Sequence, residues 1–184
     1  MSHHHAVEFV YARATLDDAV QALRRLSPES LTLTASGPSE QAPVYYGPSY
    51  DDLPGGVFEV HSAAAVGIPL PDDLPHPWDD SDRERSVRVR VAVWAGRSYV
   101  LVTLESVASV FDPYFQSSGW LRGRLIEFAD DSGALLALYL GQGTHYAPLT
   151  EPRQARGPIP DDPDDADALA VALLRAWGPD ESAV

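Results

Sequence analysis

The residues from 86 to 104 constrain the fold of this chain more than any other stretch. Strict alternation of apolar and other side chains is typical of a β-strand with one buried face. Arg88 and Arg90 occupy the second face, and Gly96 follows where a tight turn needs a positive φ angle. A second apolar run begins directly after this turn, so the stretch predicts a β-hairpin. The alternating apolar positions are Val87, Val89, Val91 and Val93.

The segments before this hairpin predict a strand, a helix and another strand. Apolar residues alternate over residues 7–11 and again over 31–35, and they recur at helical spacing over 16–26. A strand, a helix and a strand in this order are typical of a βαβ unit with parallel strands and a right-handed crossover. Residues 57–61 predict one more short strand.

The segments after the hairpin predict a second hairpin and a final helix. Residues 120–129 and 134–140 have strand character, and the four residues between them end in a glycine, as a turn does. With the first hairpin they predict an antiparallel meander of about four strands. Residues 163–177 carry a stripe of Leu, Ala and Trp and follow a capping residue at Asp162, which predicts a C-terminal helix packed on the sheet. The expected fold class is therefore α+β.

The length of 184 residues indicates one domain. We expect this domain to span residues 6–178, between a disordered histidine-containing tail at 1–5 and a flexible tail at 179–184. Long loops rich in proline are expected within it, and such loops often carry function. They cover residues 36–56, 62–85 and 148–162.

The charge balance restricts the class of partner. The chain has 27 acidic residues and 13 basic ones, all of them Arg, which gives a net charge of −14. Phosphate binding needs a positive surface, so we expect neither nucleic acid nor a membrane as a partner. An acidic surface instead attracts a basic protein. The chain has no cysteine, no apolar run of membrane-spanning length and no signal-peptide pattern, so a cytoplasmic location is expected.

No catalytic or cofactor motif stands out, and neither a metal nor a cofactor is expected. The weak catalytic candidates are single acids and histidines. Glu59 and His61 share one strand face, and an exposed polar face explains them equally well. Glu105 and Glu127 would form a carboxylate pair if the strands of the meander brought them together. His145 follows a predicted strand and has no partner identifiable by spacing.

Two groups of residues are candidates for ligand binding. Arg88 and Arg90 form either a small anion-binding strip or internal ion pairs with the protein's own acids. Four aromatic residues form either part of the core or the wall of a pocket on the sheet. These aromatic residues are Trp94, Phe111, Tyr114 and Trp120.

These observations favour a non-enzymatic, acidic protein-binding module, such as an inhibitor or an immunity-type factor for a basic partner protein. One alternative is a small-molecule-binding protein or a hydrolase-like enzyme with an aromatic pocket on the sheet. Another is a scaffold protein that uses an exposed sheet edge.

Overall fold

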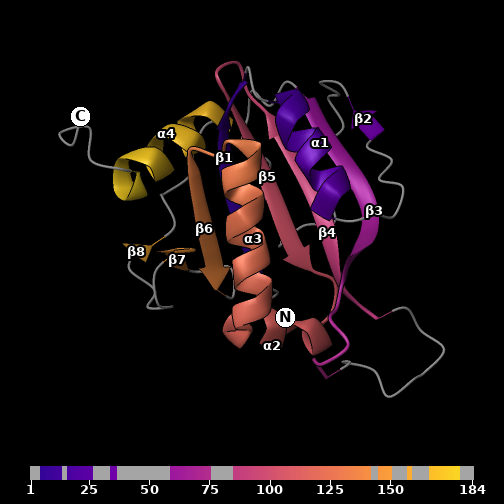
Figure 1. Cartoon of the computed structure of the whole chain (residues 1–184). Helices are drawn as coiled ribbons and strands as arrows, with labels where there is room; N and C mark the ends of the chain where they lie inside the picture. Colours follow the sequence, from indigo (N-terminus) through magenta and orange to yellow (C-terminus); the bar gives the residue numbers. More distant parts are fainter. Residues whose placement is uncertain are drawn as a thin grey trace.

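A computed structural model describes residues 5–13, 16–26, 34–36, 59–75, 85–141, 145–150, 157–158 and 166–178. In this part of the chain, one antiparallel sheet of eight strands forms the centre of the molecule (Figure 1). The strands are β1 (Ala6–Ala12), β2 (Thr34–Ser36), β3 (Glu59–Pro69), β4 (Ser86–Ala95), β5 (Tyr99–Ser106), β6 (Leu136–Gly141), β7 (His145–Pro148) and β8 (Gly157–Pro158). The α+β class predicted from the sequence is confirmed.

Helices cover both faces of this sheet. The helices α1 (Leu16–Leu26) and α3 (Gly119–Ser132) lie side by side on one face, and the short α2 (Asp112–Ser117) precedes α3 (Figure 1). We call this the α1/α3 face. The helix α4 (Ala166–Trp177) packs on the opposite face, which we call the α4 face. A 3₁₀ turn, η2 (Ser109–Phe111), leads into α2.

The strands are arranged as two meanders with the first strand between them. Across the sheet the order is β2-β3-β4-β5-β1-β6-β7-β8. One meander therefore runs from β2 to β5 and the other from β6 to β8. The strand β1 pairs with β5 on one side and with β6 on the other, so it joins the two meanders into one sheet.

The hairpin predicted over residues 86–104 is confirmed as β4 and β5. The four alternating valines are all buried on the α1/α3 face. The reason given for Gly96 was wrong, because Gly133 is the glycine with a positive φ angle in the described part of the chain. Gly96 instead makes room for a carboxylate: a Cβ atom at this position would collide with the side chain of Asp167.

The predicted second hairpin is wrong in its first half, because residues 120–129 belong to the helix α3. The side chains of Leu121, Leu125 and Phe128 recur four and three positions apart, and all three are buried. This is helical spacing. Ser118 caps the helix by accepting a hydrogen bond from the Leu121 backbone N–H at 3.2 Å. The helix ends at Gly133, in the left-handed conformation. The predicted meander over residues 86–140 is therefore wrong as well.

The expected strand–helix–strand unit is present in altered form. Every pairing from β1 through β5, β4 and β3 to β2 is antiparallel, so β1 and β2 run in the same direction. Three strands separate them, and the two therefore do not form a parallel pair. The strand predicted over residues 57–61 is longer, because β3 continues to Pro69. The first part of the loop expected at 62–85 is consequently strand.

The C-terminal helix packs on the sheet as predicted. Four side chains of α4 are buried against β1, β5 and β6, and Trp177 packs against them at the helix end. The buried side chains are those of Ala166, Leu169, Ala170 and Leu173.

The terminal tails are described only at His5. The tail expected over residues 1–5 includes this histidine, but the structure buries it beside β1 with 4% of its surface exposed. The Ser106 backbone N–H donates to the His5 carbonyl at 2.9 Å, which extends the β1–β5 ladder by one residue. The predicted tail at 179–184 and the loop predicted at 36–56, apart from Ser36, lie outside the described residues.

Candidate functional site

Two glutamates lie on the α4 face of the sheet. In β1, Ala6 and Val10 contact the core beneath α4, and Glu8 lies between them at the same strand periodicity. In β5, Leu101 contacts this core, and Glu105 lies four residues further along on the same face. Alternation along each strand therefore brings both carboxyl groups to one side of the sheet.

The register of β1 and β5 makes these glutamates neighbours. Glu8 pairs with Thr103, and Glu105 pairs with Ala6, so the glutamates occupy diagonal positions on adjacent strands. Diagonal positions of an antiparallel pair are roughly 7 Å apart. Both carboxyl groups thus belong to one polar cluster in an otherwise apolar layer.

Glu8 is fully enclosed, with 1% of its surface exposed. The Tyr146 hydroxyl, which comes from β7, donates to its carboxylate at 3.0 Å. Burial raises the pKa of Glu8 to about 7, and the Tyr146 hydrogen bond opposes this effect without cancelling it. The Glu8 carboxyl group therefore changes its charge near neutral pH.

Glu105 is buried to the same degree but has fewer partners. Its side chain is 2% exposed and lies 3.9 Å from Arg90 Nη1, on the directly opposite residue of β4. Among the described residues, neither carboxylate oxygen has a hydrogen-bond partner. Burial raises the pKa of Glu105 to about 7, Arg90 opposes this shift, and Asp112 adds to it. The ion pair with Arg90 therefore contains no hydrogen bond, and it leaves the hydrogen-bond acceptor positions of the Glu105 oxygens unfilled.

Two carboxyl groups with pKa values near 7 can exchange protons at neutral pH. They can also accept hydrogen bonds from a positively charged group. Such perturbed acids are more frequent at functional sites than elsewhere. The cluster of Glu8, Glu105, Arg90 and Tyr146 is therefore the strongest candidate site in the described part of the chain.

Of the residues predicted from the sequence, Glu105 and Arg90 come together in this cluster. Arg90 forms an ion pair with the protein's own Glu105, which is one of the two roles left open for it. Arg88 lies two residues earlier on the same face and is half-buried. Its backbone carbonyl accepts from the Val107 N–H at 3.4 Å.

Glu127 does not join Glu105. It is exposed on α3 and forms a 2.9 Å ion pair with Arg124, one helical turn earlier. Since α3 packs on the α1/α3 face, the sheet lies between the two glutamates. The predicted pairing of Glu105 with Glu127 is wrong because residues 120–129 form a helix and not a strand.

Glu59, His61 and His145 are placed by backbone position alone, because their side chains lie outside the described part of the structure. Glu59 and His61 belong to β3, and His145 opens β7. Four strands separate β3 from β7, which corresponds to about 24 Å at the usual strand spacing. The two histidine positions are therefore not parts of one site.

Three of the aromatic candidates belong to the α1/α3 side of the molecule. Phe111 is buried in the core there, and Tyr114 and Trp120 pack against that core half-buried. Trp94 lies in β4 opposite Leu101, and its side chain is outside the described residues. Among the described side chains, the aromatic group is therefore separated by the sheet from the Glu8–Glu105 cluster.

A second polar cluster, at His5, was missed in the sequence. The His5 ring stacks on Tyr139 with an interplanar angle of 11°, and its Nδ1 bonds to the Tyr139 hydroxyl. Its Nε2 lies 2.6 Å from the Gln116 side-chain nitrogen. Beside this group, the Ser106 hydroxyl donates to Asp112 at 2.6 Å.

The His5 cluster connects several elements. Its residues come from the position before β1, from β5, from β6 and from α2. His5 contacts Tyr139 and Gln116 and accepts from the Ser106 backbone N–H, and the Ser106 hydroxyl donates to Asp112. We therefore assign these groups to holding α2 against the end of the sheet.

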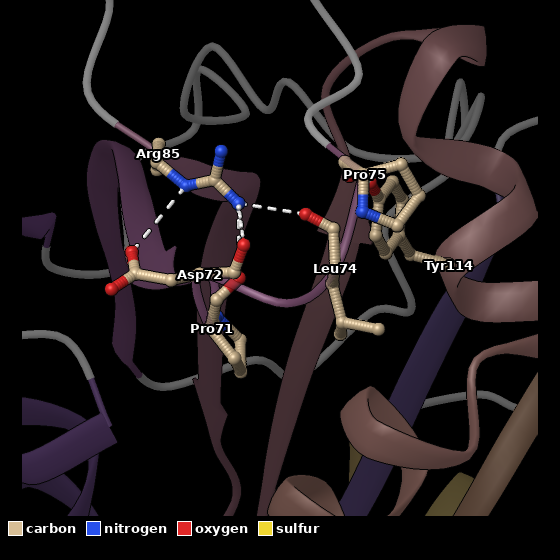
Figure 2. Close-up of polar contacts among 6 residues, drawn as sticks. All are labelled: Pro71, Asp72, Leu74, Pro75, Arg85 and Tyr114. Atoms are coloured by element: carbon tan, nitrogen blue, oxygen red, sulfur yellow. Dashed lines mark hydrogen bonds and ion pairs between the residues drawn. The ribbon is translucent and has the colours of Figure 1, made fainter.

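An arginine holds the chain that follows β3, as Figure 2 shows. Arg85 Nη2 donates to the carbonyls of Pro71, Asp72 and Leu74 at 3.0, 3.2 and 2.7 Å. Its Nε lies 3.8 Å from the Asp72 carboxylate. The Tyr114 hydroxyl donates to the Pro75 carbonyl, which attaches this segment to α2. The guanidinium group occupies the carbonyl cluster itself, so we interpret this arrangement as a structural clamp.

Glu8 could have been found from the sequence. It stands alone among Val7, Phe9, Val10 and Tyr11, and a strand that is apolar on both faces is buried on both faces. An acid within such a run is then a buried acid. His5 carries a weaker signal, because it directly precedes the strand and shows no periodicity of its own.

Comparisons with known proteins add no relative. No protein family profile, no curated protein and no solved structure matches the chain. Within the described residues, no three histidine, aspartate or glutamate side chains form a group that could hold a metal ion. None of the helices that the structure describes is long and apolar enough to cross a membrane.

Proposed function

We propose that this protein is a non-enzymatic binding module that recognises a basic partner protein, as an inhibitor or an immunity-type factor does. The observation that carries the proposal is the net charge of −14 with no lysine. A field of this strength accelerates association with a positively charged protein and disfavours nucleic acid and anionic lipid.

The placement of exposed acids supports this proposal. The helix α1 begins after β1 ends, and α3 ends before β6 begins, where Val10 pairs with Leu136. The start of α1 and the end of α3 therefore lie at the same end of the sheet (Figure 1). The acids exposed there are Asp18, Glu127, Asp130 and Asp131. We propose this end of the α1/α3 face as the surface that meets the partner.

A capture experiment at two salt concentrations tests the proposal. The immobilised protein is exposed to a lysate of its source organism at about 10 mM and about 500 mM NaCl, and captured proteins are identified by mass spectrometry. The Debye length falls from about 30 Å at 10 mM to below 10 Å. We expect one basic protein to be captured at low salt and released at high salt.

Charge variants give this experiment its control. Asp130→Asn with Asp131→Asn should weaken capture of the same protein, whereas Asp72→Asn with Asp73→Asn, on the chain after β3, should weaken it less. No salt-sensitive basic partner, or equal effects of both double variants, would count against the proposed surface.

The alternative function is less well supported by the geometry. A ligand pocket or hydrolase site with aromatic walls would need Phe111, Tyr114 and Trp120 beside the polar groups. These aromatic residues pack on the α1/α3 side, while Glu8 and Glu105 lie on the α4 face. The binding-module proposal does not require the two groups to meet.

A further inference from the structure

The Glu105 carboxylate has acceptor capacity that the described protein groups do not use. Both of its oxygens are buried, and neither accepts a hydrogen bond. A buried acceptor without a donor is unfavourable, and native proteins rarely retain one without a reason. An ionised carboxylate has about four acceptor positions, so the group is suited to a donor supplied from outside the chain.

The charges around Glu105 indicate the sign of that donor. The cluster contains two carboxyl groups, Glu8 and Glu105, and the guanidinium of Arg90. With both acids ionised, these three groups sum to one negative charge. The negative charge of Asp112 also acts on the Glu105 carboxyl group. A positively charged ligand is therefore better suited to these carboxyl groups than an anion.

Arg90 is the more exposed partner of the Glu105 ion pair. Its side chain is 34% exposed, while that of Glu105, directly opposite on β5, is 2% exposed. Since their contact is 3.9 Å and contains no hydrogen bond to Glu105, the arginine does not fill the carboxylate's acceptor positions.

The donor set fits an organic cation better than a metal ion. Calcium takes six to eight oxygen ligands, and magnesium needs six in octahedral geometry. Within the described residues, no group of three metal-ligating side chains is present. A planar guanidinium or a primary ammonium group instead brings its own N–H donors, and it needs only one or two carboxylates.

We propose that Glu105 is the anionic centre of a binding site for a small organic cation with N–H donors, a guanidinium or a primary ammonium group, on the α4 face of the sheet. The ligand's N–H groups bond to the Glu105 oxygens, and its charge is balanced by Glu105 together with Glu8. The site is distinct from the acidic end of the α1/α3 face, so it does not depend on the proposed protein partner.

The test measures binding of methylguanidinium to the full chain at pH 8 by thermal shift and by isothermal titration calorimetry. Tetramethylammonium is the matched probe, because it carries the same charge without an N–H donor. We expect saturable stabilisation by methylguanidinium and none by tetramethylammonium. A capped tripeptide that contains arginine is the third probe. If methylguanidinium binds and the tripeptide does not, the site takes small molecules. If the tripeptide binds more tightly than methylguanidinium, the site takes an arginine side chain of another protein, and the small-molecule proposal is overturned.

Three variants make the outcome specific. Glu105→Gln keeps the shape of the side chain and removes its charge, and it should weaken methylguanidinium binding at least tenfold. Glu127→Gln, on the opposite side of the sheet, should leave binding unchanged. Arg90→Ala removes the competing cation and should tighten binding at least tenfold, a readout that remains if Glu105→Gln fails to fold. Absence of saturable binding in both the parent and Arg90→Ala, or equal binding by Glu105→Gln, overturns the proposal.

Discussion

At the scale of single residues, burial makes the charge of Glu8 depend on folding. Its pKa is about 7 in the folded chain, against an ordinary value of 4.5. Below pH 4.5 the carboxyl is protonated in both states and has no effect. Between pH 4.5 and 7 the unfolded chain loses the proton while the folded chain keeps it, so stability falls as pH rises. The loss is complete above pH 7 and is on the order of 3 kcal/mol.

The variant Glu8→Gln should remove this pH dependence. The amide has no titrating proton, and its oxygen can still accept from the Tyr146 hydroxyl. The free energy of unfolding of the variant minus that of the parent, measured by urea denaturation, should therefore increase from pH 4.5 to pH 7.5. Glu127→Gln, which removes an exposed acid from the opposite side of the sheet, is the control variant. A flat difference for Glu8→Gln would show that Glu8 stays charged in the folded state.

The sequence correctly predicts which face of the sheet a residue occupies where that residue belongs to a periodic pattern. The alternation over residues 86–93 placed four valines in the core, and Arg90 opposite an acid of the protein was among the anticipated roles. Glu8 and His5 were missed because neither belongs to a motif or to a pair of polar residues at a recognisable spacing. Their environment depends on which strands flank β1, and those strands lie far away in the sequence.

At the scale of elements, two glycines of the α3 segment should respond in opposite ways to the same substitution. Gly123 lies inside the helix with nothing near its missing Cβ, while Gly133 ends the helix with a φ angle of 71°. Alanine favours helix interiors over glycine by about 1 kcal/mol and is disfavoured at positive φ by about 1 kcal/mol or more. Gly123→Ala should thus stabilise the protein, and Gly133→Ala should destabilise it. Thermal unfolding of both variants checks the prediction, which fails if both shift the melting temperature in the same direction.

The helix α4 is attached to the β4–β5 hairpin through Asp167. Its carboxylate accepts from the backbone N–H groups of Arg97, Ser98 and Tyr99 at distances between 2.9 and 3.2 Å. Hydrogen bonds to a charged acceptor contribute about 1.5–3 kcal/mol when buried and less at the surface. Asp167→Ala should therefore lower the free energy of unfolding by about 2 kcal/mol in urea denaturation.

A substitution at the other end of α4 provides the control for Asp167. Arg175→Gln replaces an exposed residue of the last helical turn, and it should change the stability by less than about 0.5 kcal/mol. Equal effects of the two substitutions would mean that the Asp167 contacts do not attach the helix.

The elements that the sequence predicted correctly are those with one dominant period. The C-terminal helix has a clear stripe, and the hairpin has a clear alternation. In α3, Ile126 and Phe128 suggested alternation, while the helical set of Leu121, Leu125 and Phe128 was overlooked. Gly119 and Gly123 weaken the helical signal further, since glycine is unfavourable in helices. Contact with α1 and the cap at Ser118 compensate for this weakness.

At the scale of the whole molecule, strand order was beyond the reach of local patterns. The sequence indicated that β1 precedes a helix and a strand, and β1 does run in the same direction as β2. It did not indicate that β5, β4 and β3 would lie between them. Strand order follows from which apolar faces can be covered together. Here α1 and α3 cover one face and α4 the other, and β1 lies between the two meanders (Figure 1).

The net charge of −14 leads to a prediction for the entire molecule. Acidic groups repel one another more strongly in the compact state than in the extended chain, and salt screens this repulsion. Exposed ion pairs such as Arg124–Glu127 weaken in salt too, but each contributes only about 0.3–0.5 kcal/mol. The melting temperature at pH 7.5 should therefore rise by several degrees between about 10 mM and about 300 mM NaCl.

The same series of melting temperatures in increasing NaCl, measured at pH 5, provides the comparison for this salt effect. Between pH 7.5 and pH 5, Glu8 and Glu105 take up protons because burial raises their pKa values to about 7, and this reduces the magnitude of the net charge. Because repulsion grows roughly with the square of the charge, the rise in melting temperature should be smaller at pH 5 than at pH 7.5. If salt lowered the melting temperature at pH 7.5, favourable ion pairs would outweigh the repulsion. The exposed acids would then be neutralised within the molecule, and the charge-based argument for a basic partner would lose its foundation.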